Sequence, residues 1–537
     1  MPRALEEPHR RRLDRWDALI TIGLVAFIAV LFVLFLERPR LSDPLVYFYS
    51  AGHIDQIEPT HRQLRIGLIW PIWAVMRVFG YSELSYHFMP AVAALLLSLS
   101  TWFLGRFLFN RWVGCVAGIS IVYNPWVLKE LTEPLPDYLA VGLFTTAITL
   151  LLWCWRTGRL NEAPLRSSTI AVLAVAGLAC GWSYLAREFV VIFFPLVPFI
   201  LFAAGSRYVA LLPIAAAAFA CWLAELLWGM LKFGDPLARL HAASPPRAGW
   251  AGMFVETDPI LILAQLPRIF LDTPGGLAFV ALLLGGAAFS VVWSALGDRR
   301  WQLIALWLIG GWLFFTAVAM LPVLLLGDDG VYLRMQKFRY WVSILPPLLV
   351  AGLAFAQYFI GWIATAPGRL GNTWMPKFAL GSLTCLLLLN STIMALPVTK
   401  GRTLVLNGGT RDYREFRQFI SDSDATEELI LLNSPRNAAN RAIPIYLNSW
   451  NGLERMWTGT VKSVREDDLD RLPRDGNVNL IVLDLTKTKN RAEAKSVSRG
   501  YPSGLLKYLD DNLNKEFESS SGYVLAYTWR HQSTSRN

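Results

Sequence analysis

Long apolar runs separated by short polar stretches fill roughly the first 400 residues of the chain. An α-helix needs about 20 mainly apolar residues to cross the hydrocarbon core of a membrane. Eleven runs approach or exceed that length, so the pattern predicts a mainly α, polytopic membrane bundle of about eleven spans. The runs are 17–36, 87–105, 112–127, 135–155, 168–186, 188–204, 208–231, 275–296, 301–326, 340–360 and 378–397.

One further apolar run, LRIGLIWPIWAVMRVFG at 64–80, is borderline in length. It has Pro71 in its middle and Arg65 and Arg77 near its ends. If it crossed the membrane, every later loop would change side and the basic loops would lie outside. We therefore expect this run to lie in the outer interface or to form a re-entrant helix.

Basic residues fix the expected orientation of the spans. With the basic segment 1–16 in the cytoplasm, the inner loops are short and rich in arginine and lysine, as the positive-inside rule requires. We expect a multi-pass protein of the plasma (inner) membrane, whose first span is retained because no A-x-A cleavage pattern follows it. The outer face then receives the loops 37–86, 232–273 and 327–339.

The pattern changes after about residue 398, where polar and charged residues dominate. Short apolar runs remain at LILLN (429–433), LIVLDL (480–485) and YVLAYTW (523–529), among helix-like stretches such as RDYREFRQFI. They predict a soluble α/β domain over 398–537, which follows a membrane module at 17–397. The odd number of spans places this domain outside the cytoplasm. No Gly-rich phosphate loop follows a strand, so no nucleotide-sugar site of the soluble type is visible.

Composition supports a membrane protein and narrows its partners. The hydrophobic fraction is 54%, and the net charge of +10 comes from basic residues that lie mainly at the ends of apolar runs. Such residues fix orientation and meet lipid phosphates, so we expect membrane lipids and no nucleic acid as partners. The five cysteines fall inside apolar runs without a CxxC pair, which does not indicate redox chemistry.

The acid that follows the first apolar run has two interpretations. Ser42, Asp43 and Pro44 make a good helix start, because Ser or Asp can cap free amides and Pro suits the first turn. A helix begun there would carry Asp43, Tyr47 and Ser50 on one side, as a polar and aromatic stripe against the membrane surface. Asp43 is therefore either a helix cap or a catalytic group at that surface.

Several features follow one another in a defined order from residue 41 to about 155. They are an outer acid after the first span (SDPLVYFYSAGHI), an interfacial segment ending in Phe-Gly, a WFLGRFLFNRWVGCVAGI hairpin and an outer acid pair in LTEPLPDYLAVGLF. YLAREFVVIFFPLVPFIL and KFRYWVSILPPLLV follow later. This order resembles the GT-C superfamily of lipid-linked-sugar glycosyltransferases, most of all the branch of protein O-mannosyltransferases and lipid A aminoarabinose transferases.

The resemblance implies an inverting membrane glycosyltransferase with Asp43 as general base. Its donor would be a sugar on a polyprenyl phosphate and its acceptor a hydroxyl group of a lipid, glycan or protein at the outer face. A carboxylate that takes the acceptor proton in the transition state accelerates such a transfer by roughly 100-fold to 10,000-fold. The lipid phosphate can leave without a general acid if cations neutralise it.

Cations of the expected outer face are the candidate donor-phosphate ligands. Arginine suits bidentate phosphate binding and lysine suits a point contact, although each residue could instead meet lipid headgroups. The candidates are Arg62, Arg65, Lys129, Arg187, Arg334, Lys337 and Arg339.

Further acids need a partner or a role. Asp137 lies just inside the fourth predicted span, where an unpaired charge costs roughly 2.5 to 3.5 kcal/mol. The family pattern suggests that Asp137, or less readily Glu133, binds the acceptor, positions a base or pairs with a phosphate-binding cation. A structural ion pair between Asp137 and Lys129 is an equal alternative. Asp328 and Asp329 resemble a divalent-metal acid pair without an evident third ligand, so metal is unassigned and no cofactor is certain.

Two other function classes compete with the enzyme. A transporter or flippase of lipid or envelope precursors would have paired broken helices near the bilayer midplane and internal two-fold similarity, neither of which is visible. A non-catalytic envelope assembly protein would tolerate the loss of Asp43.

Overall fold

A computed structural model describes most of the chain. The described residues are 13–35, 43–60, 62–128, 130–162, 164–206, 208–243, 263–272, 276–326, 339, 341–365, 374–399, 411–422, 428–433, 460–465, 480–484, 505–520, 522 and 524–529.

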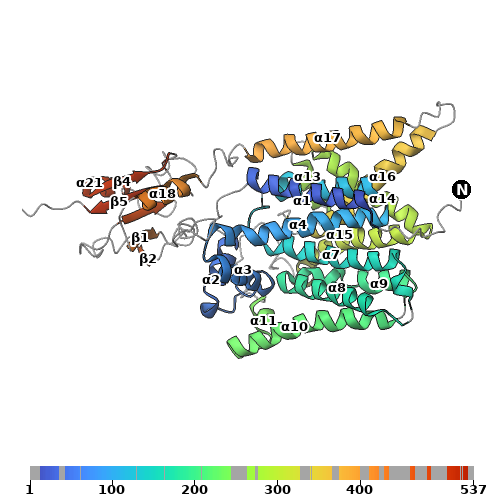
Figure 1. Cartoon of the computed structure of the whole chain (residues 1–537), viewed down its shortest axis with the longest axis horizontal. Helices are drawn as coiled ribbons and strands as arrows, with labels where there is room; N and C mark the ends of the chain where they lie inside the picture. Colours follow the sequence, from blue (N-terminus) through green and yellow to red (C-terminus); the bar gives the residue numbers. More distant parts are fainter. Residues whose placement is uncertain are drawn as a thin grey trace, which may run out of the picture. The chain divides into compact units, whose positions relative to one another are not determined.

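The chain divides into two compact units. Residues 1–32, 58–68 and 90–401 form the first unit, and residues 33–57, 69–89 and 402–537 form the second. The first unit contains nearly all of the long helices (Figure 1).

Long α-helices follow the apolar runs of the sequence. Seven segments in the described part are long and apolar enough to cross a membrane: Arg15–Phe35, Glu83–Leu108, Pro136–Arg156, Ser167–Ala186, Tyr208–Phe233, Leu277–Ala295 and Val342–Trp362. Each of the eleven predicted runs coincides with at least one helix, which confirms a mainly α, polytopic membrane protein, while the number of spans stays a prediction. The helices are α1 (Arg15–Phe35), α2 (Asp43–Gly52), α3 (Ile66–Phe79), α4 (Glu83–Leu108), α5 (Arg111–Val122), α6 (Pro125–Leu128), α7 (Pro136–Arg156), α8 (Ser167–Ala186), α9 (Leu196–Ala203), α10 (Leu211–Phe233), α11 (Ala238–Ala243), α13 (Gln265–Leu271), α14 (Leu277–Ala295), α15 (Arg299–Leu326), α16 (Leu345–Thr365) and α17 (Trp374–Thr399).

One predicted run is built differently from the others. The run 188–204 is not a single helix, because a 3-10 helix, η3 (Glu188–Phe193), precedes α9. Pro195 stands directly before α9 and has no N–H to continue the earlier turns. The run 64–80, which we expect to lie in the outer interface or to form a re-entrant helix, contains the helix α3, and Pro71 lies inside that helix.

Local sequence explains where several helices begin and end. Asn110 caps α5, since its side chain accepts a hydrogen bond from the Val113 amide at 3.1 Å. Pro136 is the first residue of α7, where its missing N–H is not needed. Gly234 ends α10 with φ of 70°, a left-handed conformation that glycine adopts without strain.

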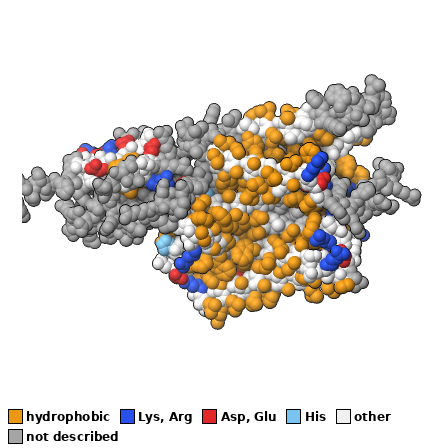
Figure 2. Space-filling view, in the orientation of Figure 1, with side chains coloured by type: hydrophobic (Ala, Val, Ile, Leu, Met, Phe, Trp, Pro, Cys, Tyr) orange, Lys and Arg blue, Asp and Glu red, His pale blue; other side chains and the backbone are white. Residues whose placement is uncertain are grey.

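Lipid-facing and protein-facing sides of these helices differ. Hydrophobic side chains cover the visible face of the helices in Figure 2, and charged side chains gather towards the helix ends. On α10, Leu212, Phe219, Leu227 and Leu231 are exposed. Exposed apolar residues in such numbers match a surface that lies in hydrocarbon.

Small residues let neighbouring helices approach closely. Helices α7, α8 and α10 run side by side (Figure 1). A Cβ atom on Gly177 of α8 would lie 2.3 Å from the carbonyl oxygen of Ile214 on α10, and one on Gly286 of α14 would lie 2.7 Å from the amide nitrogen of Gly352 on α16. Close backbone approach at glycine is a typical way for membrane helices to associate.

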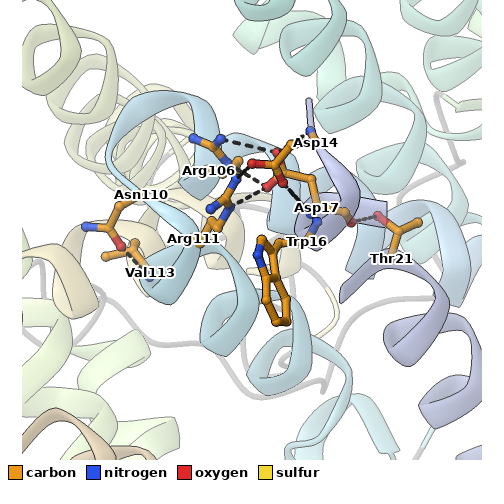
Figure 3. Close-up of polar contacts among 8 residues, drawn as sticks. All are labelled: Asp14, Trp16, Asp17, Thr21, Arg106, Asn110, Arg111 and Val113. Atoms are coloured by element: carbon orange, nitrogen blue, oxygen red, sulfur yellow. Dashed lines mark hydrogen bonds and ion pairs between the residues drawn. The ribbon is translucent and has the colours of Figure 1, made fainter. Parts of the chain in front are cut away.

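A buried ion cluster ties α1 to the turn between α4 and α5 (Figure 3). Asp17 Oδ1 accepts hydrogen bonds from Arg106 Nε at 2.9 Å and from Arg111 Nε at 2.8 Å. Asp14 also binds Arg111. Asp17 and Arg106 are almost fully buried, at 2% and 6% exposure. These contacts fix one end of α1, which otherwise exposes most of its surface.

The C-terminal region contains a five-stranded mixed sheet with the order β2-β1-β3-β5-β4. The first three strands of that order are parallel, and β5 is antiparallel to both β3 and β4. A separate α/β domain over 398–537 stays a prediction. The elements are α18 (Arg411–Asp422), β1 (Glu428–Asn433), β2 (Thr460–Arg465), β3 (Leu480–Asp484), α21 (Leu505–Asn512), β4 (Leu513–Glu518) and β5 (Val524–Trp529).

Candidate functional site

Asp43 is the first residue of α2, as the helix-start pattern predicts. Its side chain is half-buried, whereas Tyr47 and Ser50 are only 4% and 2% exposed. Tyr47 and Ser50 of the predicted stripe are therefore packed inside the protein, while the position of the stripe relative to the membrane surface stays a prediction. Phe48 supports this packing, with its ring 4.7 Å from that of Tyr81.

A second set of candidate residues meets at the end of α8. Asp137 stands in the first turn of α7, and Arg187 follows the last residue of α8 in an extended conformation with φ of −153° and ψ of 116°. Arg187 Nε lies 2.9 Å from Asp137 Oδ1, and their side chains are 12% and 2% exposed. The N–H does not align on the oxygen as in a hydrogen bond, so the contact is an ion pair. Asp137 thus pairs with Arg187, a cation of the candidate phosphate-binding set, while the role of the pair in binding phosphate stays a prediction.

Glu188, the next residue in sequence, accepts hydrogen bonds from two arginines on one carboxylate oxygen. Arg65 Nη1 and Arg239 Nη2 both donate to Glu188 Oε2, the latter at 2.9 Å. Arg65 precedes α3 and is 5% exposed. The predicted cation Arg65 is therefore held by a carboxylate of the same unit.

Arg239, on α11, binds three further acceptors besides Glu188. It donates to Glu225 Oε1 of α10 at 2.8 Å, and to the carbonyl oxygens of Tyr184 and Leu185 at 3.0 and 3.2 Å. The two carbonyls belong to the last turn of α8, whose free acceptors favour a cation. Arg239 thereby joins α8, α10 and α11.

The turn that leads into α11 is closed by hydrogen bonds to Asp235. Asp235 Oδ2 lies 2.7 Å from Nδ1 of His241, and Asp235 Oδ1 accepts a hydrogen bond from the Leu237 amide at 2.9 Å. The hydrogen bond from His241 holds the pKa of the Asp235 carboxyl below its usual range. These bonds position the α11 backbone, from which Arg239 extends.

We refer to Arg65, Asp137, Arg187, Glu188, Glu225 and Arg239 as the arginine–acid cluster. Its three arginines and three acids balance in formal charge. Charges inside a membrane protein are tolerated when they are paired in this way, and removal of one partner leaves an uncompensated buried charge. Chemically, the cluster offers guanidinium groups that suit a phosphate or a carboxylate.

The remaining candidates have different surroundings. Glu133 is buried at 2% exposure in the segment before α7, Arg62 is exposed and Arg339 is half-buried. Lys129, Arg334, Lys337, Asp328 and Asp329 lie outside the described residues. Among the residues that are described, no group of three or more His, Cys, Asp or Glu side chains is arranged to hold a metal ion.

Sequence reasoning did not select Glu225 or Arg239. Glu225 is the single acid within the apolar run 208–231, and such an isolated charge is a signal of a partner or a role. Arg239 gives no comparable signal, because it lies outside the apolar runs, in the segment 232–273 that the sequence predicts to be a loop, and Tyr184, Leu185 and Glu188 lie more than 50 positions before it.

Comparisons with known proteins support the fold. No family model and no curated protein sequence matches the chain. The structure of ArnT from Cupriavidus metallidurans in the apo state is similar, with 12% identity, a TM-score of 0.54 and coverage of 95% of this chain and 98% of that chain. ArnT bound to undecaprenyl phosphate gives 11% identity, a TM-score of 0.52 and coverage of 94% and 97%.

The oligosaccharyltransferase AglB from Archaeoglobus fulgidus is also similar, with 12% identity, a TM-score of 0.46 and coverage of 98% of this chain and 76% of that chain. The two ArnT structures, whose TM-scores exceed 0.5, are those of a GT-C glycosyltransferase. The resemblance inferred from the sequence is confirmed at the level of the fold.

Proposed function

We propose that this chain, which has the fold of the GT-C glycosyltransferases, is an enzyme that moves a sugar from a polyprenyl-phosphate-linked donor to a hydroxyl acceptor. The observation that carries the proposal is the match to ArnT bound to undecaprenyl phosphate, which covers 94% of this chain and 97% of that chain. Because nearly the whole of this chain aligns with nearly the whole of ArnT, the match supports a polyprenyl phosphate as the lipid carrier of the sugar here as well.

In the proposed reaction Asp43 is the general base. Its carboxylate takes the proton of the acceptor hydroxyl while that oxygen attacks the anomeric carbon of the sugar. The bond from the anomeric carbon to the phosphate oxygen breaks in the same displacement, so the configuration inverts. The position of Asp43 at the start of α2, half-buried beside Pro44, supports a group held in a fixed place.

The leaving group is a polyprenyl phosphate, which needs positive charge more than it needs a proton. Arg65 and Arg187 are two of the described candidates for this task, and both are oriented by acidic partners. Arginine neutralises and orients phosphate through its planar pair of donors. Arg62, Lys129, Arg334, Lys337 and Arg339 stay candidates for the same role.

We further propose that the protein resides in the plasma (inner) membrane, with the N-terminus in the cytoplasm and transfer on the outer side. The basic loops between the spans support this orientation. The donor would then be met on the outer leaflet, where the segment that carries Asp43 is expected.

A transfer assay tests the proposal. The purified protein in lipid nanodiscs is given a radiolabelled sugar on a polyprenyl phosphate or, separately, the same sugar on a nucleotide, together with a membrane lipid or glycan extract as acceptor. We expect label in the acceptor fraction with the lipid-linked donor alone. Equal transfer from the nucleotide sugar, or movement of a labelled lipid between leaflets without any transfer, would contradict the proposal.

A further inference from the structure

The arginine–acid cluster contains a convergence of two guanidinium groups on one oxygen atom. Arg65 and Arg239 come from segments far apart in sequence and both donate to Glu188 Oε2. An oxygen that receives two guanidinium donors is a normal arrangement for a phosphate as well as for a carboxylate. Glu188 therefore occupies a position that an anionic oxygen of a ligand would suit.

The position of Arg239 does not depend on Glu188. Its guanidinium also binds Glu225 and the carbonyl oxygens of Tyr184 and Leu185. Its side chain is 12% exposed, and it lies over the Tyr184 ring with 5.0 Å between the guanidinium carbon and the ring centroid. If Glu188 moved away, Arg239 would stay where it is.

The two arginines and Glu188 differ in their access to solvent. The side chain of Glu188 is 44% exposed, whereas that of Arg65 is 6% exposed. Because the segment that carries Glu188 is expected at the outer face, a glutamate side chain that is 44% exposed there can rotate outward and be hydrated, while the buried guanidinium groups cannot follow it. The departure of Glu188 would leave the cluster with one net positive charge, since Asp137 pairs with Arg187 and Glu225 pairs with Arg239.

We infer that Glu188 is an internal counter-anion that a phosphate-bearing ligand displaces from Arg65 and Arg239, and that Arg239 is a ligand-binding residue. The inference rests on the proposed function for its choice of ligand, a lipid-linked phosphate. Glu188 neutralises the arginines when no ligand is present. Only molecules in which Glu188 has moved away can bind the phosphate, so the apparent affinity for the ligand is reduced in proportion to the fraction in which Glu188 still pairs with the arginines.

Binding of undecaprenyl phosphate to the purified protein in nanodiscs tests the inference. Glu188→Ala removes the competitor, so we expect about tenfold tighter binding, whereas Arg239→Gln should weaken binding about tenfold. In the double variant the gain from Glu188→Ala should disappear. Glu188→Ala also removes two ion contacts, so its melting temperature should fall while its affinity rises, a pair of opposite changes that a merely structural carboxylate would not produce.

Glu162→Ala is the matched control. Glu162 pairs with Arg166 at 3.2 Å on the segment between α7 and α8, near the other ends of those helices. Its loss should leave the affinity for undecaprenyl phosphate unchanged.

Separate arms with phosphatidylglycerol and with inorganic phosphate identify the source of the phosphate. If Glu188→Ala binds only undecaprenyl phosphate more tightly, the lipid carrier is the ligand that displaces Glu188. If its affinity for phosphatidylglycerol or inorganic phosphate rises equally, any phosphate group can displace it. Both outcomes support the displacement. Unchanged or weaker binding of all three probes to Glu188→Ala overturns it. Because no sugar is transferred in this measurement, its result is independent of the transfer assay above.

Discussion

Asp137 and Arg187 form a buried ion pair whose disruption we expect to destabilise the membrane bundle. Their side chains are 2% and 12% exposed and lie at the ends of two adjacent helices. Removing one member of a buried pair costs about 3–5 kcal/mol, because the other charge is left without compensation. We predict a loss of this size for Asp137→Ala in the free energy of unfolding in detergent.

The double variant Asp137→Leu/Arg187→Met provides the control for this pair. It removes both charges of the pair together, so we expect it to recover most of the lost stability. If the double variant were as unstable as Asp137→Ala, pairing with Arg187 would not be the reason for the effect of the single substitution.

The close packing around Gly67 leads to a second prediction about stability. A Cβ atom there would lie 2.2 Å from the amide nitrogen of Ala186, at the end of α8. Trp182 Nε1 also donates to the Gly67 carbonyl at 2.8 Å, so the contact has little room to adjust. Gly67→Ala should destabilise the protein by about 1–3 kcal/mol in thermal or denaturant unfolding.

Gly23 is the matched control for Gly67, since a Cβ atom on Gly23 would meet nothing within 4 Å. Gly23→Ala should be neutral or stabilising by up to about 1 kcal/mol, because alanine favours the helix. Equal losses of stability in Gly67→Ala and Gly23→Ala would show that the close approach of α3 to α8 is not the reason why alanine destabilises position 67.

Part of the site was predictable from residue type alone. An acid just inside a span must have a partner, so Asp137 was singled out from the sequence. The sequence does not decide between Lys129 and other cations as the ion-pair partner of Asp137. Arg187 lies 50 positions later, and helical spacing relates only residues a few positions apart. Glu225 gave the same type of signal, whereas Arg239 was identified only by the folded structure.

At the scale of elements, the first helix depends on one ion cluster. Asp17 receives hydrogen bonds from Arg106 and Arg111, at the end of α4 and the start of α5 (Figure 3). Asp17→Ala would leave Arg106 buried without its carboxylate. We predict a loss of about 3–5 kcal/mol in the free energy of unfolding, measured in detergent, with earlier proteolysis of α1.

Asp14→Ala should have a much smaller effect on the same two measurements, since Asp14 is exposed and contacts Arg111 alone of the two arginines. A larger effect from Asp14→Ala than from Asp17→Ala would contradict the view that the buried carboxylate holds α1 in place.

Most helices and the inner strands of the sheet can be predicted from the apolar pattern of the sequence, whereas the edge strands cannot. Apolar patterns identified β1, β3 and β5, which are the three inner strands of the order β2-β1-β3-β5-β4. The sequences TVKSVR and LNKEFE form the two edge strands, β2 and β4. Edge strands commonly carry charged residues that discourage pairing with other chains, so their sequences do not stand out as apolar runs.

At the scale of the whole molecule, the basic loops predict which side of the membrane each end of the chain occupies. An alkaline phosphatase fusion after Lys400 should be active, because that enzyme needs an extracytoplasmic location, and a fusion after Arg159 should be inactive. The opposite pattern at these two positions would show that the number or the direction of the spans is wrong.

The most direct test of the account is sugar transfer by Asp43→Asn. The substitution keeps the size of the side chain and removes its ability to accept a proton, so transfer from a polyprenyl-phosphate donor should fall by roughly 100-fold to 10,000-fold. Asp55→Asn, which changes an exposed acid three residues beyond the end of α2, should retain normal transfer. If Asp43→Asn transferred sugar at the rate of the unaltered protein, while remaining folded in the membrane, Asp43 would not be the general base.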